Sequence, residues 1–105
     1  MYLIVTRSFP PELGGMQSLM WGLVKEMSKN FMVKVFADYQ ENHKEFDRKE
    51  NFSIERIGGI KFLRKIRKAQ LVNEFLKENK VQGILADHWK SLELIKTDKK
   101  KYCLI

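Results

Sequence analysis

The sequence has little of several residue types that mark particular classes of protein. Its 105 residues include one cysteine, Cys103, so no disulfide can form within the chain and nothing indicates secretion. No apolar run approaches the ~20 residues of a membrane-spanning helix, and the first run ends at Arg7, too early for a signal peptide. Two widely spaced histidines, His43 and His88, and one cysteine form no metal-ligand cluster, so no metal site is expected. We therefore expect one cytoplasmic globular domain.

Negative charge is also scarce. The chain has 20 Lys and Arg against 13 Asp and Glu, which gives a net charge of +7. Such an excess favours an anionic partner: nucleic acid, an acidic bilayer or a phosphorylated small molecule. Aromatic residues do not alternate with the basic residues as a stacking platform for bases would require, so we expect no nucleic-acid partner.

The basic residues are densest in segment 61–80, which is predicted to be a helix. The cations near its start are Lys61, Arg64, Lys65, Arg67 and Lys68. One interpretation is a surface helix with a solvated basic face. The other is contact with an anionic membrane surface, to which each basic residue contributes about 1 kcal/mol. The second interpretation would place the protein peripherally on the inner face of the membrane.

The rest of the sequence alternates between strand and helix patterns. Expected strands are 2–6, 31–37, 52–57, 83–86 and 102–105, and expected helices are 16–29, 61–80 and 89–96. The polar segment 38–51 is expected to be a solvated loop in which His43 is exposed. Strands separated by helices pair in parallel through right-handed crossovers. The predicted fold is α/β, a Rossmann-like three-layer sandwich with a mostly parallel sheet of order 3-2-1-4-5, truncated at the fifth strand.

The segment between the first strand and the first helix is the most informative motif. It contains Pro10-Pro11 and then Gly14-Gly15 directly before the helix. A helix N-terminus presents unpaired N–H groups and suits an anionic group, and glycine lets a ligand approach the backbone. The pattern lacks the G-x-G-x-x-G dinucleotide fingerprint and the G-K-[ST] of a P-loop. It predicts an anion site at the sheet edge, or else only a loop that starts a helix.

The order Phe-Pro-Pro-x-x-Gly-Gly over residues 9–15, followed by a helix with Leu19, Leu23 and Met27, resembles the N-terminal loop of family-4 glycosyltransferases of the GT-B fold. The resemblance implies that residues 1–105 are a partial N-terminal, acceptor-side domain. It implies sugar transfer from a nucleotide-sugar donor to an unknown acceptor with retention of configuration, without a metal or other cofactor. The implied donor- or acceptor-binding residues are Gly14, Gly15, Glu12, Gln17 and His88.

A second constellation, Asp87-His88-Trp89, follows the fourth strand at its carboxyl end, where ligands bind in such sheets. Asp87 is either a helix cap or a site residue, and Trp89 either stacks on a sugar or packs. His88 is either an exposed loop histidine or a ligand contact. The strand order predicts that loop 7–15 and residues 87–89 flank one crevice, with Gly15 in the first turn of the helix.

The sequence also departs from the family pattern. The family's second domain, with its paired-glutamate motif, is absent, and so is the histidine that follows the fifth strand. Before the second strand, Asn30-Phe31-Met32-Val33 stands where Gly-His-x-Val is common. We therefore assign no catalytic residue and expect the chain to be inactive alone. Alternatives are a non-catalytic binding module, a subunit of a split enzyme, or a small nucleotide-binding protein.

Overall fold

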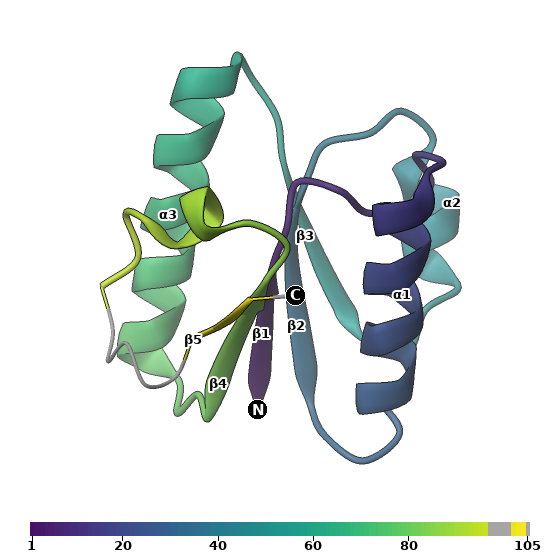
Figure 1. Ribbon diagram of the computed structural model, residues 1–105, viewed down its shortest axis with the longest axis horizontal. Coiled ribbons are helices and arrows are strands. Elements are labelled where there is room, and N and C mark those ends of the chain that lie inside the picture. Colours follow the sequence, from purple (N-terminus) through teal and green to yellow (C-terminus); the bar gives the residue numbers. More distant parts are fainter. Residues whose placement is uncertain (97–101, 105) are drawn as a thin grey trace.

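The computed structural model describes residues 1–96 and 102–104. Its centre is a five-stranded parallel sheet (Figure 1). The strands are β1 (Tyr2–Val5), β2 (Val33–Asp38), β3 (Ser53–Ile57), β4 (Gly83–Ala86) and β5 (Tyr102–Leu104). Their order is β3-β2-β1-β4-β5 and every neighbouring pair is parallel. The predicted Rossmann-like α/β fold and strand order are confirmed. Ile105, predicted as the end of the fifth strand, lies outside the described residues.

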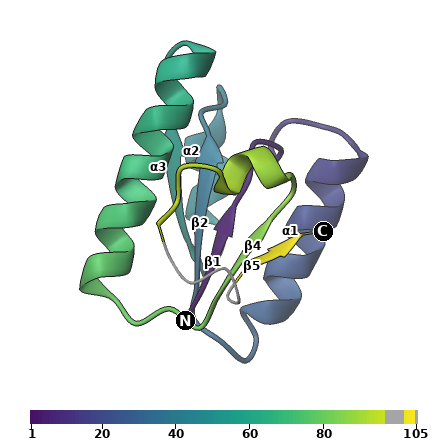
Figure 2. The same cartoon turned by 60° about the vertical axis from the view of Figure 1, so that its left-hand side comes forward.

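Helices cover both faces of the sheet, which gives three layers (Figures 1 and 2). On one face lie α1 (Gly15–Met27) and α2 (His43–Arg48). On the other lie α3 (Lys61–Glu78) and the 3-10 helix η1 (Trp89–Leu92). Because every neighbouring pair of strands is parallel, the carboxyl ends of the strands lie along one end of the sheet, which we call the carboxyl edge.

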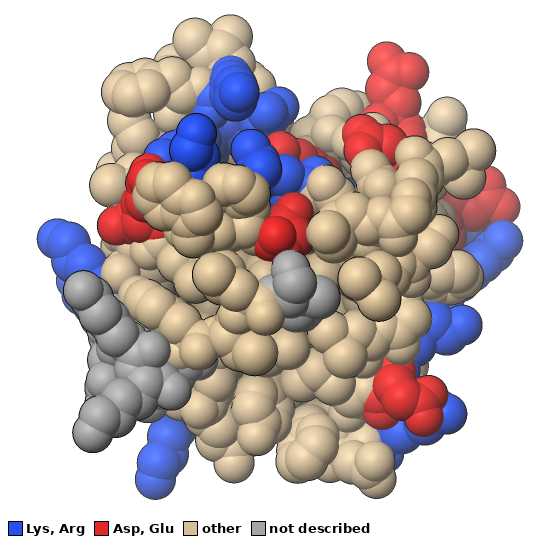
Figure 3. Space-filling model, viewed as in Figure 1, with Lys and Arg blue, Asp and Glu red and all other residues tan. Residues whose placement is uncertain are grey.

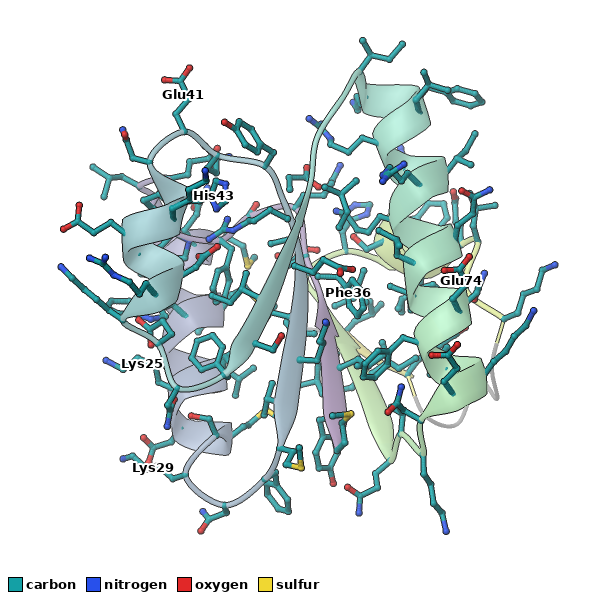
Figure 4. The ribbon with its side chains drawn as sticks, turned by 180° about the vertical axis from the view of Figure 1, so that it is seen from behind. Lys25, Lys29, Phe36, Glu41, His43 and Glu74 are labelled. Atoms are coloured by element: carbon teal, nitrogen blue, oxygen red, sulfur yellow. The ribbon has the colours of Figure 1, made fainter. Side chains whose placement is uncertain are left out.

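Each central strand is buried on both faces, because successive side chains point to opposite sides. In β1, Leu3 and Val5 join the core under α3, while Ile4 joins the core under α1. Phe36 of β2 lies between the sheet and α3 and meets Phe75 edge-to-face at 5.9 Å (Figure 4). These two cores fix the helices relative to the carboxyl edge.

The expectation of a solvated loop over 38–51 is wrong at its centre, where residues 43–48 form α2. The physical reason is Phe46, whose ring meets those of Phe9 and Trp21 at 6.1 and 5.6 Å. His43, predicted to be exposed, has a side chain only 19% exposed and a 3.1 Å hydrogen bond from Nδ1 to Asp47 Oδ2. Glu41, just before the helix, does point into solvent (Figure 4).

The predicted helix over 89–96 is only the single 3-10 turn of η1. Asn73 of α3 explains why the helix stops, since its side chain binds the backbone that follows. Its Oδ1 accepts from Lys96 N at 2.8 Å and its Nδ2 donates to Leu94 O at 3.0 Å. The two predicted anchors, Leu92 and Ile95, are nevertheless buried.

Candidate functional site

The two loops that the sequence placed side by side are in contact at the carboxyl edge. The Arg7 backbone N–H donates to Asp87 Oδ2 at 3.2 Å, just beyond the register pair Val5 and Ala86 of β1 and β4. The Ser91 hydroxyl donates to Asp87 Oδ1, also at 3.2 Å. Asp87 thus ties the two loops and η1 together.

Asp87 is not the cap of the following helix, so that alternative is wrong. The cap is His88, whose Nδ1 accepts from Lys90 N at 3.1 Å. With Nδ1 accepting, the neutral ring carries its proton on Nε2, which leaves one N–H donor for a further partner. The half-buried ring also stacks against Trp89, with centroids 5.8 Å apart.

The Gly-Gly loop begins α1 as predicted, because Gly15 is the first residue of the helix. The two glycines differ in what surrounds them. A Cβ on Gly14 would collide with the Gln17 side chain, whereas a Cβ on Gly15 would meet no atom within 4 Å. The space at Gly15 is therefore open, and no packing within the described chain requires glycine there.

The side chains of Glu12 and Gln17 are hydrogen-bonded to each other across this loop. Gln17 Nε2 donates to Glu12 Oε1, and Gln40 Nε2 donates to Glu12 Oε2 at 2.8 Å. Both carboxylate oxygens of Glu12 already have an intramolecular donor. The two side chains thus shape the loop, and a ligand would have to displace these hydrogen bonds to bind them.

A separate cavity of about 340 Å³ opens at the carboxyl edge on the α3 side. We call it the basic cavity. Its cationic lining residues come from the end of β1, the first two turns of α3 and η1: Arg7, Lys61, Arg64, Lys65, Lys68 and Lys90. The single carboxylate in its wall is Asp38, at the end of β2. In Figure 3, Lys and Arg side chains gather in this region beside the start of α3.

Lys68 and Asp38, which both line the basic cavity, form a buried ion pair. Lys68 is 6% exposed; its Nζ lies against Asp38 Oδ1 and donates to Thr6 O at 3.1 Å. Arg64 Nε reaches the other oxygen, Asp38 Oδ2, at 3.3 Å. Desolvation lowers the pKa of Lys68 from its ordinary 10.5, and the charge of Asp38 offsets part of that effect.

The prediction that Lys68 faces a membrane is therefore wrong. Position 68 lies four residues before Val72, on the helix face that packs against the sheet. Arg64 and Lys65 are half-buried, and Lys65 is paired with Glu93. Only Lys61 and Arg67 of the five predicted membrane-facing residues are exposed, and Arg67 lies outside the basic cavity.

The sequence interpretation missed three of the charged residues that line this cavity: Arg7, Asp38 and Lys90. Asp38 ends β2, Arg7 follows β1 by two residues and Lys90 lies in η1 after β4, so all three belong to the carboxyl edge, where ligands bind in such sheets. None of the five residues predicted to bind donor or acceptor lines the cavity. The carboxyl edge thus carries two separate features, the open helix start at Gly15 and the basic cavity.

Neither a metal centre nor a membrane span is found in the described parts of the chain. Residues 1–96 and 102–104 contain no group of three or more His, Cys, Asp or Glu side chains arranged to hold a metal ion. No helix within them has both the length and the apolar character needed to cross a bilayer. The chain matches no known protein-family model, and comparison with curated proteins finds no match.

Proposed function

We propose that this chain is the acceptor-side part of a retaining glycosyltransferase that uses a nucleotide-sugar donor. The observation that carries the proposal is the open helix start at Gly15, which follows β1 at the carboxyl edge and lies on the loop that contacts Asp87. The Phe-Pro-Pro-x-x-Gly-Gly pattern of the same loop supports it by resemblance.

The proposed role of this loop is to stabilise negative charge. The first N–H groups of α1 have no partner within the helix, and the helix dipole adds positive potential at the same point. A diphosphate at Gly15 would accept hydrogen bonds from these groups while charge develops on the leaving group. His88 offers one further N–H donor from the neighbouring loop.

Amide chemical shifts test the proposal most directly. A titration with UDP- and GDP-sugars should give weak, saturable shifts at Gly14, Gly15 and Met16, and Gly15→Val should abolish them. Because a Cβ at Gly15 meets no atom within 4 Å, the variant should unfold at nearly the same denaturant concentration as the wild type. Chemical-shift changes confined to other residues would contradict the assignment. So would a Gly15→Val variant that loses free energy of unfolding as much as it loses free energy of binding.

Two alternatives give different results in the same experiment. A self-sufficient nucleotide-binding protein would bind the plain nucleotides as tightly as the sugar nucleotides. A binding module or split-enzyme subunit would bind weakly and gain transferase activity only with a partner that holds the donor. Multiple turnovers by the 105-residue chain alone would contradict the expectation that it is inactive.

We also retain peripheral association with the inner face of an anionic membrane as a prediction, on a smaller set of residues. The start of α3 exposes Phe62 and Leu63, which are 71% and 57% exposed. Lys61 and Arg67 are exposed on the same end of the helix. Apolar side chains bordered by cations suit the boundary between acyl chains and anionic headgroups.

A further inference from the structure

We propose that the basic cavity is a binding site for a phosphate monoester, separate from the Gly-Gly loop. The inference does not depend on the glycosyltransferase proposal, because it rests only on the residues that line the cavity. The resemblance assigns binding to the Gly-Gly loop and assigns nothing to this cavity.

The charges in the cavity are unbalanced. Six cationic side chains line it against the single carboxylate of Asp38. That carboxylate is already held by Lys68 and Arg64, and Lys65 is paired with Glu93. Among the described residues, Arg7, Lys61 and Lys90 have no carboxylate partner. An anionic ligand would supply the missing partner.

The donors suit phosphate better than a monoanion such as a carboxylate. Arg64 contacts Asp38 through Nε, and no hydrogen bond or ion pair of its two terminal nitrogens is seen among the described residues. Arginine presents its N–H groups in a planar fork that matches two oxygens of a phosphate. Arg7 brings a second fork from the loop after β1, and Lys61 and Lys90 add point charges from α3 and η1. A dianion with several oxygens can use these groups together.

The volume of the basic cavity and its uncharged lining residues suit the organic part of a small phosphate ester. A volume of about 340 Å³ lies near the lower end of the range for small-molecule pockets, roughly 300–1,000 Å³. Phe62 and Ala69 supply apolar wall, and the Ser91 hydroxyl adds a polar group. A free sugar phosphate and the phosphate headgroup of a lipid share the required chemistry. The cations come from three segments around a hollow, not from the extended stripe that nucleic acid requires.

The experiment is an amide chemical-shift titration of the whole chain, with inorganic phosphate and then glycerol 3-phosphate. We expect saturable shifts at Ala69 and Ser91 and none at Gly15. Arg7 and Lys90 are exposed, so Arg7→Gln and Lys90→Gln should leave the fold intact. Far-UV circular dichroism of each variant checks this. Each should weaken binding about tenfold or more, which corresponds to about 1.4 kcal/mol. The matched control is Lys77→Gln, an exposed lysine in the last turn of α3, which should change affinity less than about twofold.

A second arm separates the two sources of phosphate. Vesicles of phosphatidylcholine with phosphatidic acid are compared with pure phosphatidylcholine, using the same variants. Binding of glycerol 3-phosphate shows that the free ester is sufficient. Binding only to phosphatidic acid vesicles, lost in Arg7→Gln and Lys90→Gln, assigns the phosphate to a lipid headgroup.

Three results would overturn the proposal. One is the absence of saturable binding in both arms, and another is equal weakening by Lys77→Gln. The third is phosphate shifts centred on Gly14 and Gly15, which would support the Gly-Gly site and remove the cavity site. Conversely, absence of sugar-nucleotide shifts at Gly15 in the wild type, with phosphate binding at the cavity, would remove the glycosyltransferase proposal alone.

Discussion

Asp38 is the residue that organises the cations at the carboxyl edge. It ends β2, where the strand order brings it beside the end of β1 and the first turns of α3. Its two oxygens hold Lys68 and Arg64, and the Lys68 ammonium also reaches Thr6 O. Burying a charge costs several kcal/mol unless it is paired and hydrogen-bonded, so each member of this group depends on the others.

Removal of both partners of the buried pair should therefore cost less than the two single removals added together. We expect Lys68→Met to lower the free energy of unfolding by about 3 kcal/mol, the low end for a broken buried pair, because Arg64 remains on Asp38. The double variant Asp38→Asn with Lys68→Met should lose less than the sum of the two single variants. Urea unfolding of the four proteins measures the coupling, and strictly additive losses would contradict it.

The lowered pKa of Lys68 predicts a pH dependence with a definite sign. Between that lowered value and 10.5, the folded state binds fewer protons than the unfolded state. The free energy of unfolding contributed by this group must then rise with pH across that range. Urea unfolding of the wild type and of Lys68→Met, compared over the same pH range, isolates the contribution. A difference between the two proteins that falls with rising pH would contradict the direction of the pKa shift.

Single residues also show where sequence interpretation succeeds and fails. The start of α1 at Gly15 was predictable because a local pattern, Gly-Gly after a strand, determines it. The burial of Lys68 was not predicted because lysine is normally solvated, and here its buried position depends on the tertiary partner Asp38. The basic cavity joins Arg7, Asp38 and Lys90, whose proximity depends on the packed sheet and helices. No local pattern carries that information.

At the scale of elements, α2 is the helix that the sequence did not reveal. It has six residues with one apolar anchor, Phe46, and isolated helices of this length are marginal in water. Its stability comes from tertiary contacts instead. The Arg56 side chain of β3, 3% exposed, binds Asp47 through Nη2 at 2.8 Å and Nε at 3.1 Å. The same guanidinium donates to Pro10 O and to Asp38 O.

Through these contacts Arg56 connects α2, the end of β2 and the Gly-Gly loop (residues 7–15), which contains Pro10. Arg56→Lys keeps the charge but loses the planar fork, so we expect a loss of about 1–3 kcal/mol in the free energy of unfolding. The amides of Phe9 and of residues 12–15 should exchange faster with solvent, because Pro10 O loses its donor. The control is Arg48→Lys, an exposed residue of α2. Unchanged exchange in this loop would show that Arg56 holds α2 but not the loop.

At the scale of the whole molecule, the five strands and their order followed from the sequence because apolar runs mark buried parallel strands. The β1–β2 and β1–β4 pairings place the switch point of the sheet at β1. The two features of the carboxyl edge lie on opposite sides of that strand: the Gly-Gly loop leads to α1, and the basic cavity adjoins α3 (Figures 1 and 2). A ligand that spans β1 would contact both.

The arrangement of the molecule also predicts which surface would meet a bilayer in the proposed membrane association. The exposed start of α3 stands at the carboxyl edge, so association through Phe62, Leu63, Lys61 and Arg67 would bring the basic cavity to the membrane surface. We expect weak co-sedimentation with phosphatidylglycerol vesicles that disappears in 1 M salt, where the Debye length falls to about 3 Å. The double variant Lys61→Gln with Arg67→Gln should weaken binding by about 2 kcal/mol, since each basic residue near the surface contributes about 1 kcal/mol. Lys77→Gln, at the far end of α3, should have little effect. Binding that survives high salt, or that responds equally to Lys77→Gln, would exclude this end of α3 as the membrane contact.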